Sequence, residues 1–495
     1  MAIEEAKKSG NQTELDVLAQ DLATLKAMED EAAKFGEAVG LDSVSTFECI
    51  VDRDKHFFME MNTRIQVEHR VSELCQGLEF TNPEDSNDSF RVESLVEAMV
   101  LLAAHGERLP KPTRFERNND SVEARLNATN AALQPHAGGI IEYWSNPIEG
   151  EIRDDQGISL HNPDTGVFMK YTLAGAYDSN IALLLTVGNT RLHTYEQMAE
   201  VIRCSNISGR DLATNLQFHY GLVNWFIGNN INARPTTRFI VPYLTSVGEL
   251  KAASSNIDVV YAYAGIEKAL SSKFDSDQKA GLAETLAHKY SLLKHPLDQL
   301  LRSPHELSGW LSRYANTCSL QDGKVVWATN PLQLVADTYH FLNMDHQEGK
   351  AAAEMIWGHD HQLLQSGLNF YANLSDKLGV SDWVELQAAL ASDKAVSSLG
   401  AELCREARNA HAGFQSGLDI LDILPGIAAQ TGFADFSDND GLTIDIPGRL
   451  EDTNHQKLMA KELAPPPVAS SNEILAASGG MFYPCLLYTS DAADE

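Results

Sequence analysis

The chain has 495 residues, of which 43% are hydrophobic, and a formal net charge of −31 at pH 7. This length is enough for two or more domains with cores of their own. So large an acidic excess argues against binding to nucleic acid or to anionic membranes, both of which favour a basic face. Six scattered cysteines, with neither a signal-peptide pattern nor an apolar run long enough to cross a bilayer, predict a cytoplasmic protein.

The first predicted element is a helix over residues 12–39. This segment is rich in Ala, Leu, Glu and Lys, and Gly40 follows it as a stop signal. Its apolar residues recur at helical spacing and form one stripe, made of Leu15, Leu18, Leu22, Leu25 and Met28.

Two strands joined by the polar turn 52–55 are predicted next, over residues 46–51 and from residue 57 onward. Glu60, Asn62 and Arg64 are spaced by two, so a strand would point all three to one face. If Val51 pairs with Phe57, Glu48 lies directly opposite Glu60, at about 5 Å. Two carboxylates at that distance repel each other, and a hard divalent cation between them would reverse the penalty. The spacing therefore predicts a magnesium site.

The run Glu60-Met-Asn-Thr-Arg-Ile-Gln-Val-Glu-His69 resembles the signature of biotin carboxylase, the ATP-grasp component of biotin-dependent carboxylases. The usual motif continues with Pro-Val-Thr-Glu, where this chain has residues 70–73, Arg-Val-Ser-Glu. Shorter resemblances follow at 122–128, 135–140, 152–153, 177–179 and 214–215, the last expected at the end of a helix. The resemblance implies an α+β fold, with residues 1–40 as a helical remnant of the ATP-grasp domain and residues 41–250 as the C-terminal half of a biotin carboxylase.

The same resemblance implies roles for individual residues. Glu48, Glu60 and Asn62 would bind Mg²⁺ (or Mn²⁺) with ATP, because hard oxygen ligands suit that ion. Bicarbonate would be held by the side chains of Arg64 and Gln66 and by the Val67 backbone. Glu68 would be the general base that deprotonates bicarbonate, and we expect it to be buried with cationic groups nearby. Arg153 would stabilise the enolate-like oxygen of deprotonated biotin. His69 is given no chemical role.

The segments that hold ATP in that family lie upstream of these motifs. About forty residues precede the first acidic strand here, and they contain no glycine-rich loop. We therefore expect a truncated chain that is inactive alone.

Residues 251–460 are expected to be a mostly helical spacer or docking region. Helices are predicted at 282–301, 334–343, 383–390 and 399–413, and a short strand at 441–447. Residues 461–472 read as a Pro/Ala linker. Residues 473–484 resemble the start of a biotinyl carrier domain, whose biotin-accepting lysine is absent, and residues 485–495 are expected to be a non-native tail.

These features predict the biotin carboxylase component of an acyl-CoA carboxylase α subunit, of the acetyl- or propionyl-CoA type. Its cofactors would be ATP, Mg²⁺ and biotin on a carrier domain, its partner a carboxyltransferase, and its complete form a homo-oligomer. One alternative is another ATP-grasp ligase such as carbamoyl-phosphate synthetase. A second is a non-enzymatic assembly subunit with a vestigial site. The intact run from Arg64 to Glu68 and the carrier-like C-terminus favour the carboxylase.

Overall fold

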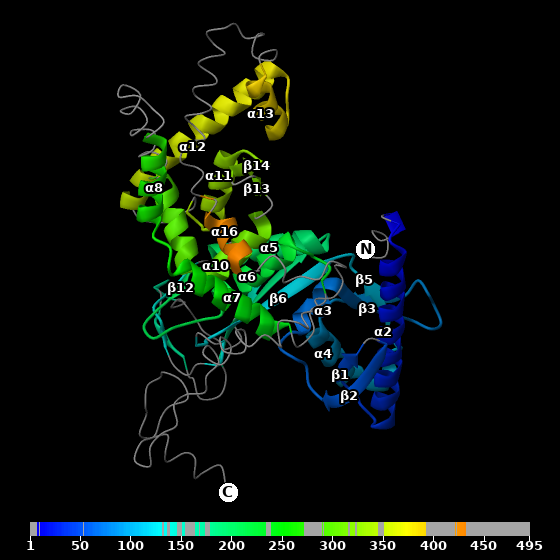
Figure 1. Ribbon diagram of the computed structural model, residues 1–495. Coiled ribbons are helices and arrows are strands. Elements are labelled where there is room, and N and C mark those ends of the chain that lie inside the picture. The colour runs from blue at the N-terminus through cyan, green and yellow to red at the C-terminus, as the bar shows by residue number, and fades with distance from the viewer. Residues whose placement is uncertain are drawn as a thin grey trace. The chain divides into compact units, whose positions relative to one another are not determined.

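The computed structural model divides the chain into two compact units, and Figure 1 labels most of their helices and several of their strands. Unit 1 comprises residues 1–127, 146–171 and 178–201, and unit 2 comprises residues 128–145, 172–177 and 202–495. The structure describes residues 7–8, 10–52, 54–130, 133–135, 139–145, 151–153, 164–167, 169–173, 179–233, 239–271, 290, 292–314, 317–321, 324–344, 351–392, 421 and 423–431.

Unit 1 mixes helices with antiparallel strands, in agreement with the predicted α+β class. Its helices are α2 (Gln12–Ala38), α3 (His69–Cys75), α4 (Leu95–His105) and the 3-10 turn η1 (Gly106–Arg108). Its strands are β1 (Thr46–Asp52), β2 (Lys55–Asn62), β3 (Gln76–Thr81), β4 (Ser89–Val92), β5 (Thr113–Glu116), β6 (Asp120–Asn127), β9 (Glu151–Arg153) and β11 (Asn180–Gly188). Strand β10 (Tyr171–Thr172) and helix α5 (Arg191–Cys204) each begin in unit 1 and end in unit 2.

Strand β11 is the centre of the buried sheet of unit 1. It pairs antiparallel with β6 on one edge and with β9 on the other. The side chains of residues 181–185, Ile-Ala-Leu-Leu-Leu, are buried without alternation, as expected for a strand covered on both faces. A second sheet, in the order β4-β3-β5, carries a small core of Phe80, Val92 and Ala98.

Helix α2 lies beside the hairpin of β1 and β2. Phe35 of α2 contacts Phe47 and Phe58 of the hairpin, with ring centroids 6.0 and 5.2 Å apart. The helix predicted over 12–39 is confirmed, and Gly40 follows it with φ +67°. Its apolar stripe is not a core face throughout, because Leu22 and Leu25 are about half exposed.

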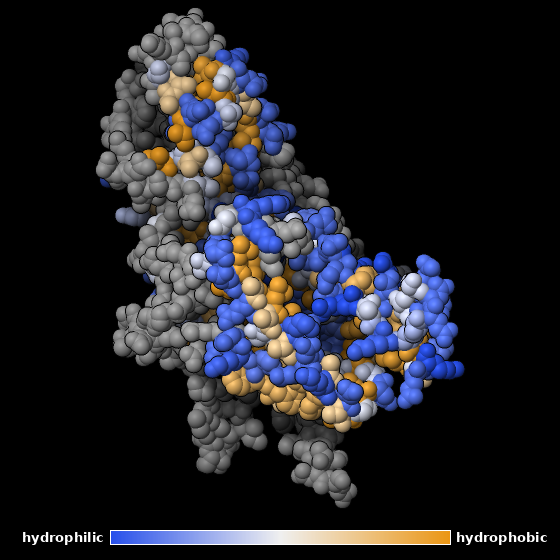
Figure 2. Space-filling model, turned by 90° about the vertical axis from the view of Figure 1, so that its right-hand side faces the viewer, coloured by the Kyte–Doolittle hydropathy of each residue, from blue (hydrophilic) through white to orange (hydrophobic). Residues whose placement is uncertain are grey.

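The outer face of the hairpin is also apolar and open. Ile50 lies opposite Phe57 in the register, and their exposed fractions are 56% and 55%. The side of the molecule that carries α2 in Figure 1 faces the viewer in Figure 2, where apolar surface gathers into a band between hydrophilic flanks. Exposed apolar surface of this extent is typical of a region that contacts another segment or another chain.

The described part of unit 2 is mostly helical. Its helices are α6 (Leu216–Gly228), α7 (Ile240–Ser254), α8 (Val259–Ser271), α10 (Pro304–Tyr314), α11 (Pro331–Phe341), α12 (Ala351–Leu378), α13 (Trp383–Ala391) and α16 (Ile423–Thr431). Its strands are β7 (Ile140–Ile141), β8 (Tyr143–Trp144), β12 (Ile207–Ser208), β13 (Cys318–Gln321) and β14 (Lys324–Trp327). None of the helices described in either unit has the length and apolar character needed to cross a bilayer.

The core of unit 2 forms where α6, α7 and α10 meet. Trp225, Tyr243 and Trp310 are among the largest fully buried side chains of the chain. Helices α6 and α10 approach closely at Gly221, where an added Cβ would lie 2.5 Å from the carbonyl oxygen of His305. This packing buries large aromatic rings without leaving their polar atoms unsatisfied, since the Trp310 Nε1 donates to Thr338 Oγ1 at 2.9 Å.

The structure tests several predicted elements of the C-terminal half. The helices predicted at 334–343 and 383–390 are confirmed as α11 and α13, and of the helix predicted at 282–301 the described residues, 290 and 292–301, are helical. Thr214 and Asn215 were wrongly placed at the end of a helix, because Asn215 is the N-cap residue of α6. The hairpin of β13 and β14 was not predicted. The predicted helix 399–413, the strand 441–447 and all segments from 461 onward lie outside the described residues.

Candidate active site

The two predicted acidic strands form an antiparallel hairpin that pairs Glu48 with Glu60. The premise of that prediction was wrong, because Val51 pairs with His56 rather than with Phe57. A β-bulge next to Glu48 gives β2 one extra residue and so restores the predicted pairing at the two carboxylates. Such bulges commonly occur beside active sites, where they redirect a side chain.

Two side-chain amides converge on the carboxylate of Glu48. The Asn62 Nδ2 donates to Glu48 Oε1 at 2.8 Å and also to Glu60 Oε1 at 3.2 Å. The Gln66 Nε2 donates to the same Glu48 Oε1, again at 2.8 Å. The Asn62 NH₂ group therefore contacts both carboxylates and reduces their mutual repulsion. The three predicted metal ligands and one predicted bicarbonate ligand form one hydrogen-bonded group.

Arg64 does not extend this group along the strand. Strand β2 ends at Asn62, so the prediction that Glu60, Asn62 and Arg64 share one strand face is wrong for Arg64. Its guanidinium is exposed and donates to the carbonyl oxygen of Ile65 at 3.2 Å. Val67 is half-buried in the turn that precedes α3.

The two predicted catalytic residues outside this group differ in their surroundings. Glu68 is the N-cap residue of α3, but its side chain makes no capping hydrogen bond and is exposed. The expected burial of this residue is therefore wrong. Arg153 lies on β9, opposite Leu183, in a different sheet from the hairpin. Its side chain lies outside the described residues.

The donor set of the hairpin fits a hard divalent cation. Two carboxylates and one amide oxygen are ligands that Mg²⁺ accepts, with water and phosphate oxygens as the remainder. Asn62 now presents its NH₂ group to both carboxylates, and a ligand role requires its Oδ1 instead. Rotation of the Asn62 amide group by half a turn would exchange the positions of Nδ2 and Oδ1. Within the described part of the chain, no group of three or more His, Cys, Asp or Glu side chains forms a metal site.

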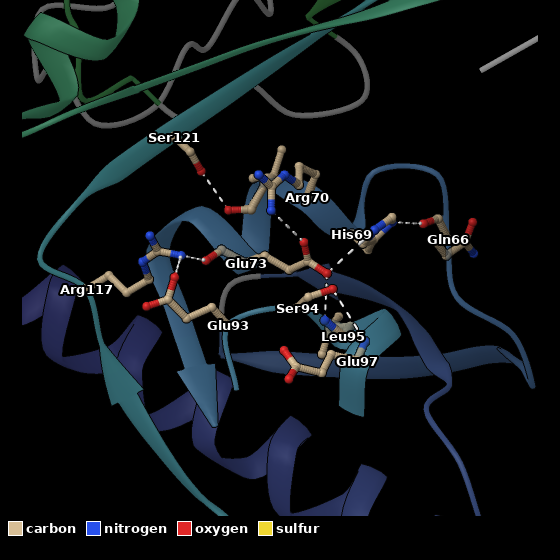
Figure 3. Close-up of polar contacts among 11 residues, drawn as sticks. Gln66, His69, Arg70, Glu73, Glu93, Ser94, Leu95, Glu97, Arg117 and Ser121 are labelled. Atoms are coloured by element: carbon tan, nitrogen blue, oxygen red, sulfur yellow. Dashed lines mark hydrogen bonds and ion pairs between the residues drawn. The ribbon is translucent and has the colours of Figure 1, made fainter. Parts of the chain in front are cut away.

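A second polar cluster, which the sequence analysis missed, surrounds Glu73 in α3 (Figure 3). This carboxylate is only 3% exposed. Its Oε1 accepts the backbone N–H of Leu95 at 2.7 Å, and its Oε2 accepts the Arg70 guanidinium at 3.1 Å. The His69 Nε2 lies 3.5 Å from Glu73 Oε1. The spacing of His69 and Arg70 at four and three residues before Glu73 was a visible signal, because such residues meet on one helix face.

The match to a known family model includes the acidic hairpin. Residues 18–83 match the family model "Carbamoyl-phosphate synthase L chain, ATP binding domain". Biotin carboxylase 1 of Bacillus subtilis is 29% identical over 231 residues, which are 46% of this chain and 44% of the relative. The propionyl-CoA carboxylase alpha chain of Ruegeria pomeroyi is 32% identical over 212 residues, 40% of this chain and 28% of the relative.

Among solved structures, the chain is similar to the biotin carboxylase domain of Hydrogenobacter thermophilus 2-oxoglutarate carboxylase, solved with MgADP, ADP and bicarbonate. The identity is 28% and the TM-score 0.29, over 38% of this chain and 36% of that one. The chain spans less than half the length of the curated relatives named above. Over the parts that match, the chain is similar to the ATP-binding domain of the carbamoyl-phosphate synthase L chain and to a biotin carboxylase and a propionyl-CoA carboxylase alpha chain.

Proposed function

We propose that this chain carries the metal- and bicarbonate-binding segment of a biotin carboxylase, which carboxylates biotin with ATP and bicarbonate. One observation carries the proposal: the amides of Asn62 and Gln66 converge on Glu48 Oε1, with Glu60 paired opposite. Elementary electrostatics predicts a cation at such a pair of carboxylates. The biotin carboxylases among the relatives support the choice of reaction.

Glu48, Glu60 and Asn62 would hold Mg²⁺ or Mn²⁺. When bound, that ion neutralises charge on the phosphate oxygens of ATP. Gln66 would keep one amide hydrogen on Glu48 and offer its remaining donor capacity to bicarbonate, because a primary amide has two N–H donors.

Bicarbonate would lie beside this metal group, against the turn 63–68. The exposed Arg64 can leave the Ile65 carbonyl and present its planar fork to the planar anion. The Val67 backbone would complete the anion site. Glu68, one residue further, would accept the bicarbonate proton, since a base must lie within hydrogen-bond reach of the proton it takes. Arg153 would stabilise the deprotonated ureido oxygen of biotin.

The finer assignment is to an acyl-CoA carboxylase α subunit. The similarity to a propionyl-CoA carboxylase alpha chain supports it, as does the resemblance of residues 473–484 to the start of a biotinyl carrier domain. A carboxyltransferase and a carrier domain would be its partners, and the cytoplasm its location. Residues 251–460, which were predicted to be mostly helical, would then be a spacer or docking region.

A second candidate is a carbamoyl-phosphate synthetase-like ligase, which the description of the matching family model favours. Both reactions begin with activation of bicarbonate by ATP, so metal and bicarbonate binding do not distinguish the two candidates. Binding of biotin does distinguish them, because only the carboxylase uses it. Because the chain is expected to be inactive alone, the test is binding: broadening of the biotin resonances by the chain loaded with Mn²⁺ would support the carboxylase, and biotin resonances unchanged by the chain would support the alternative.

The site itself can be tested on the full chain with Mn²⁺ and ¹³C-bicarbonate. Paramagnetic Mn²⁺ held by Glu48 and Glu60 should broaden the bicarbonate resonance beyond the broadening that the same Mn²⁺ gives without protein. Glu60→Gln should abolish this broadening through loss of metal, and Arg64→Ala through loss of the anion. Glu68→Gln should retain it, because that residue is assigned as base and not as ligand. Equal broadening in the Glu60→Gln and wild-type proteins would contradict the proposal.

A further inference from the structure

A continuous series of polar contacts leads from the interior of unit 1 to the hairpin carboxylates. It begins at the buried Glu73 carboxylate, which accepts the Leu95 N–H at 2.7 Å and the Arg70 guanidinium at 3.1 Å. Leu95 is the first residue of α4, so the carboxylate lies at the positive end of an eleven-residue helix. A buried carboxylate satisfied by a helix terminus and a guanidinium is a fixed point in the structure.

Helix α3 is also held through its backbone carbonyl groups. With seven residues it is too short to be stable by itself, so its contacts determine its position. Three of its carbonyl oxygens accept hydrogen bonds from side chains of residues 117–121, and two of them, those of Glu73 and Leu74, belong to the last turn, where no intrahelical N–H is available. The bonds run from Arg117 to Glu73 O (3.0 Å), from Asn119 to Leu74 O (3.3 Å) and from Ser121 to Val71 O (2.7 Å).

His69 connects this fixed helix to the site loop. Its Nδ1 lies 2.8 Å from the Gln66 carbonyl oxygen, and because a carbonyl only accepts, Nδ1 is the donor. The opposite ring nitrogen, Nε2, lies 3.5 Å from Glu73 Oε1, and the two form an ion pair when the imidazole carries a proton on both nitrogens, since an unprotonated Nε2 and a carboxylate both accept. The Gln66 side chain then donates to Glu48 Oε1 at 2.8 Å. Figure 3 shows Gln66, His69 and Glu73 in this order.

The hairpin needs such support. Among the described strands, β1 and β2 pair only with each other, and a two-stranded sheet is marginally stable alone. Mg²⁺ requires near-ideal octahedral geometry, so a carboxylate whose position is not fixed binds it poorly. The contact from Gln66 is therefore the link through which the rigid part of unit 1 can fix the Glu48 carboxylate.

We propose that His69 and Glu73 are a buried positioning pair: they hold Gln66 against Glu48 and so set the Glu48 carboxylate for a divalent cation. The inference rests on the proposed function, because it assigns the orienting contacts of that metal site. Groups that orient metal ligands typically change metal affinity by about 10- to 100-fold when removed. Neither residue touches the metal or the substrate in this account.

The test uses the full chain, with free Mn²⁺ measured by electron paramagnetic resonance and with amide hydrogen exchange of residues 63–68 followed without metal. His69→Leu and Glu73→Gln should each weaken Mn²⁺ binding about tenfold and speed exchange in that loop. His69→Asn, which keeps a side-chain N–H near the position of Nδ1, should restore slow exchange and most of the affinity. This rescue is not expected of a residue that only fills space.

His56 offers a matched control on the same hairpin, because its Nε2 lies 2.8 Å from Glu31 Oε2 and takes no part in the series. His56→Leu should leave Mn²⁺ affinity and loop exchange unchanged. Wild-type values in His69→Leu, or equal losses in His69→Leu and His69→Asn, would overturn the inference. If Glu48→Gln and Glu60→Gln bind Mn²⁺ like the wild type, the proposed metal site fails instead, and the metal-free exchange data still decide the positioning role.

Discussion

The helical core of unit 2 and the acidic hairpin of unit 1 are stabilised by different means. The core of unit 2 buries large aromatic rings, with Trp310 only 1% exposed, and satisfies their polar atoms internally. The hairpin leaves Ile50 and Phe57 more than half exposed and gathers carboxylates and amides at its other end. Apolar burial therefore supplies stability in unit 2, whereas the polar contacts of the hairpin hold the carboxylates and amides in position relative to one another.

The largest expected effect lies in the core of unit 2. Trp310→Ala removes a buried ring and leaves Thr338 without its indole donor, so the free energy of unfolding should fall by about 3–5 kcal/mol. All six tryptophans of the chain belong to unit 2, so urea unfolding followed by tryptophan fluorescence reports on that unit. Tyr261→Ala is the control, because that ring is 80% exposed and should change stability by less than about 0.5 kcal/mol. Equal effects of the two substitutions would contradict the comparison.

A second effect in unit 2 depends on pH. Burial, and to a smaller extent the charge of Lys251, lowers the pKa of His305 from 6.5 to about 4. Above pH 6.5 the imidazole is neutral in both states; as the pH falls toward 4, only the unfolded chain takes up the proton. Stability should therefore decrease over that window, by about 3 kcal/mol from this residue.

The neighbouring Glu306 has the opposite effect on stability as the pH falls, because burial raises the pKa of its carboxyl group. The contribution of His305 is therefore isolated by comparing wild type with His305→Asn. Urea unfolding between pH 7 and pH 4 should show a shallower loss of stability in the variant. Parallel curves would mean that His305 titrates in the folded protein as it does in the unfolded chain.

The sequence predicted the hairpin and its acidic pair because their signals are local. Alternating residues and the polar turn define the two strands, and Glu48 was correctly paired with Glu60. The bulge in β2 has no local signal, and neither does the end of β2 at Asn62, which moved Arg64 off the strand face. The helical spacing of His69, Arg70 and Glu73 was a local signal for their contact, but the burial of Glu73 depends on the first residue of α4, 22 positions further along the chain, and no local pattern predicts it.

In unit 2 the confirmed helices are those with clear starting signals. Helix α11 has Asn330 as its N-cap residue and Pro331 at its first helical position. Helix α13 has Asp382 as its N-cap residue, directly before Trp383. The hairpin of β13 and β14 was missed although Asp322-Gly323 separates its strands, a pair typical of tight hairpin turns. Its strands have only four residues each, too few for a periodicity to stand out.

The smallest effect on stability is expected on the open face of the hairpin, where self-association should change instead. Phe57→Ser should alter the unfolding free energy by less than about 0.5 kcal/mol and reduce concentration-dependent association in sedimentation experiments. Phe58 is the control on the same strand, because its ring contacts Phe35 and Phe47 at 5.2 and 4.9 Å. Phe58→Ser should loosen the contact with α2. Unchanged association of Phe57→Ser would show that this face contacts nothing in solution.

The most direct test of the metal site is a crystal structure of the full chain soaked with Mn²⁺, read by anomalous scattering. The account predicts one peak between Glu48 and Glu60, about 2.1 Å from a carboxylate oxygen of each, as for Mg²⁺. Asn62 should have turned its amide so that Oδ1 faces the ion, while Gln66 keeps its contact with Glu48. A peak elsewhere on the chain, with the Asn62 NH₂ still contacting both carboxylates, would contradict the assignment.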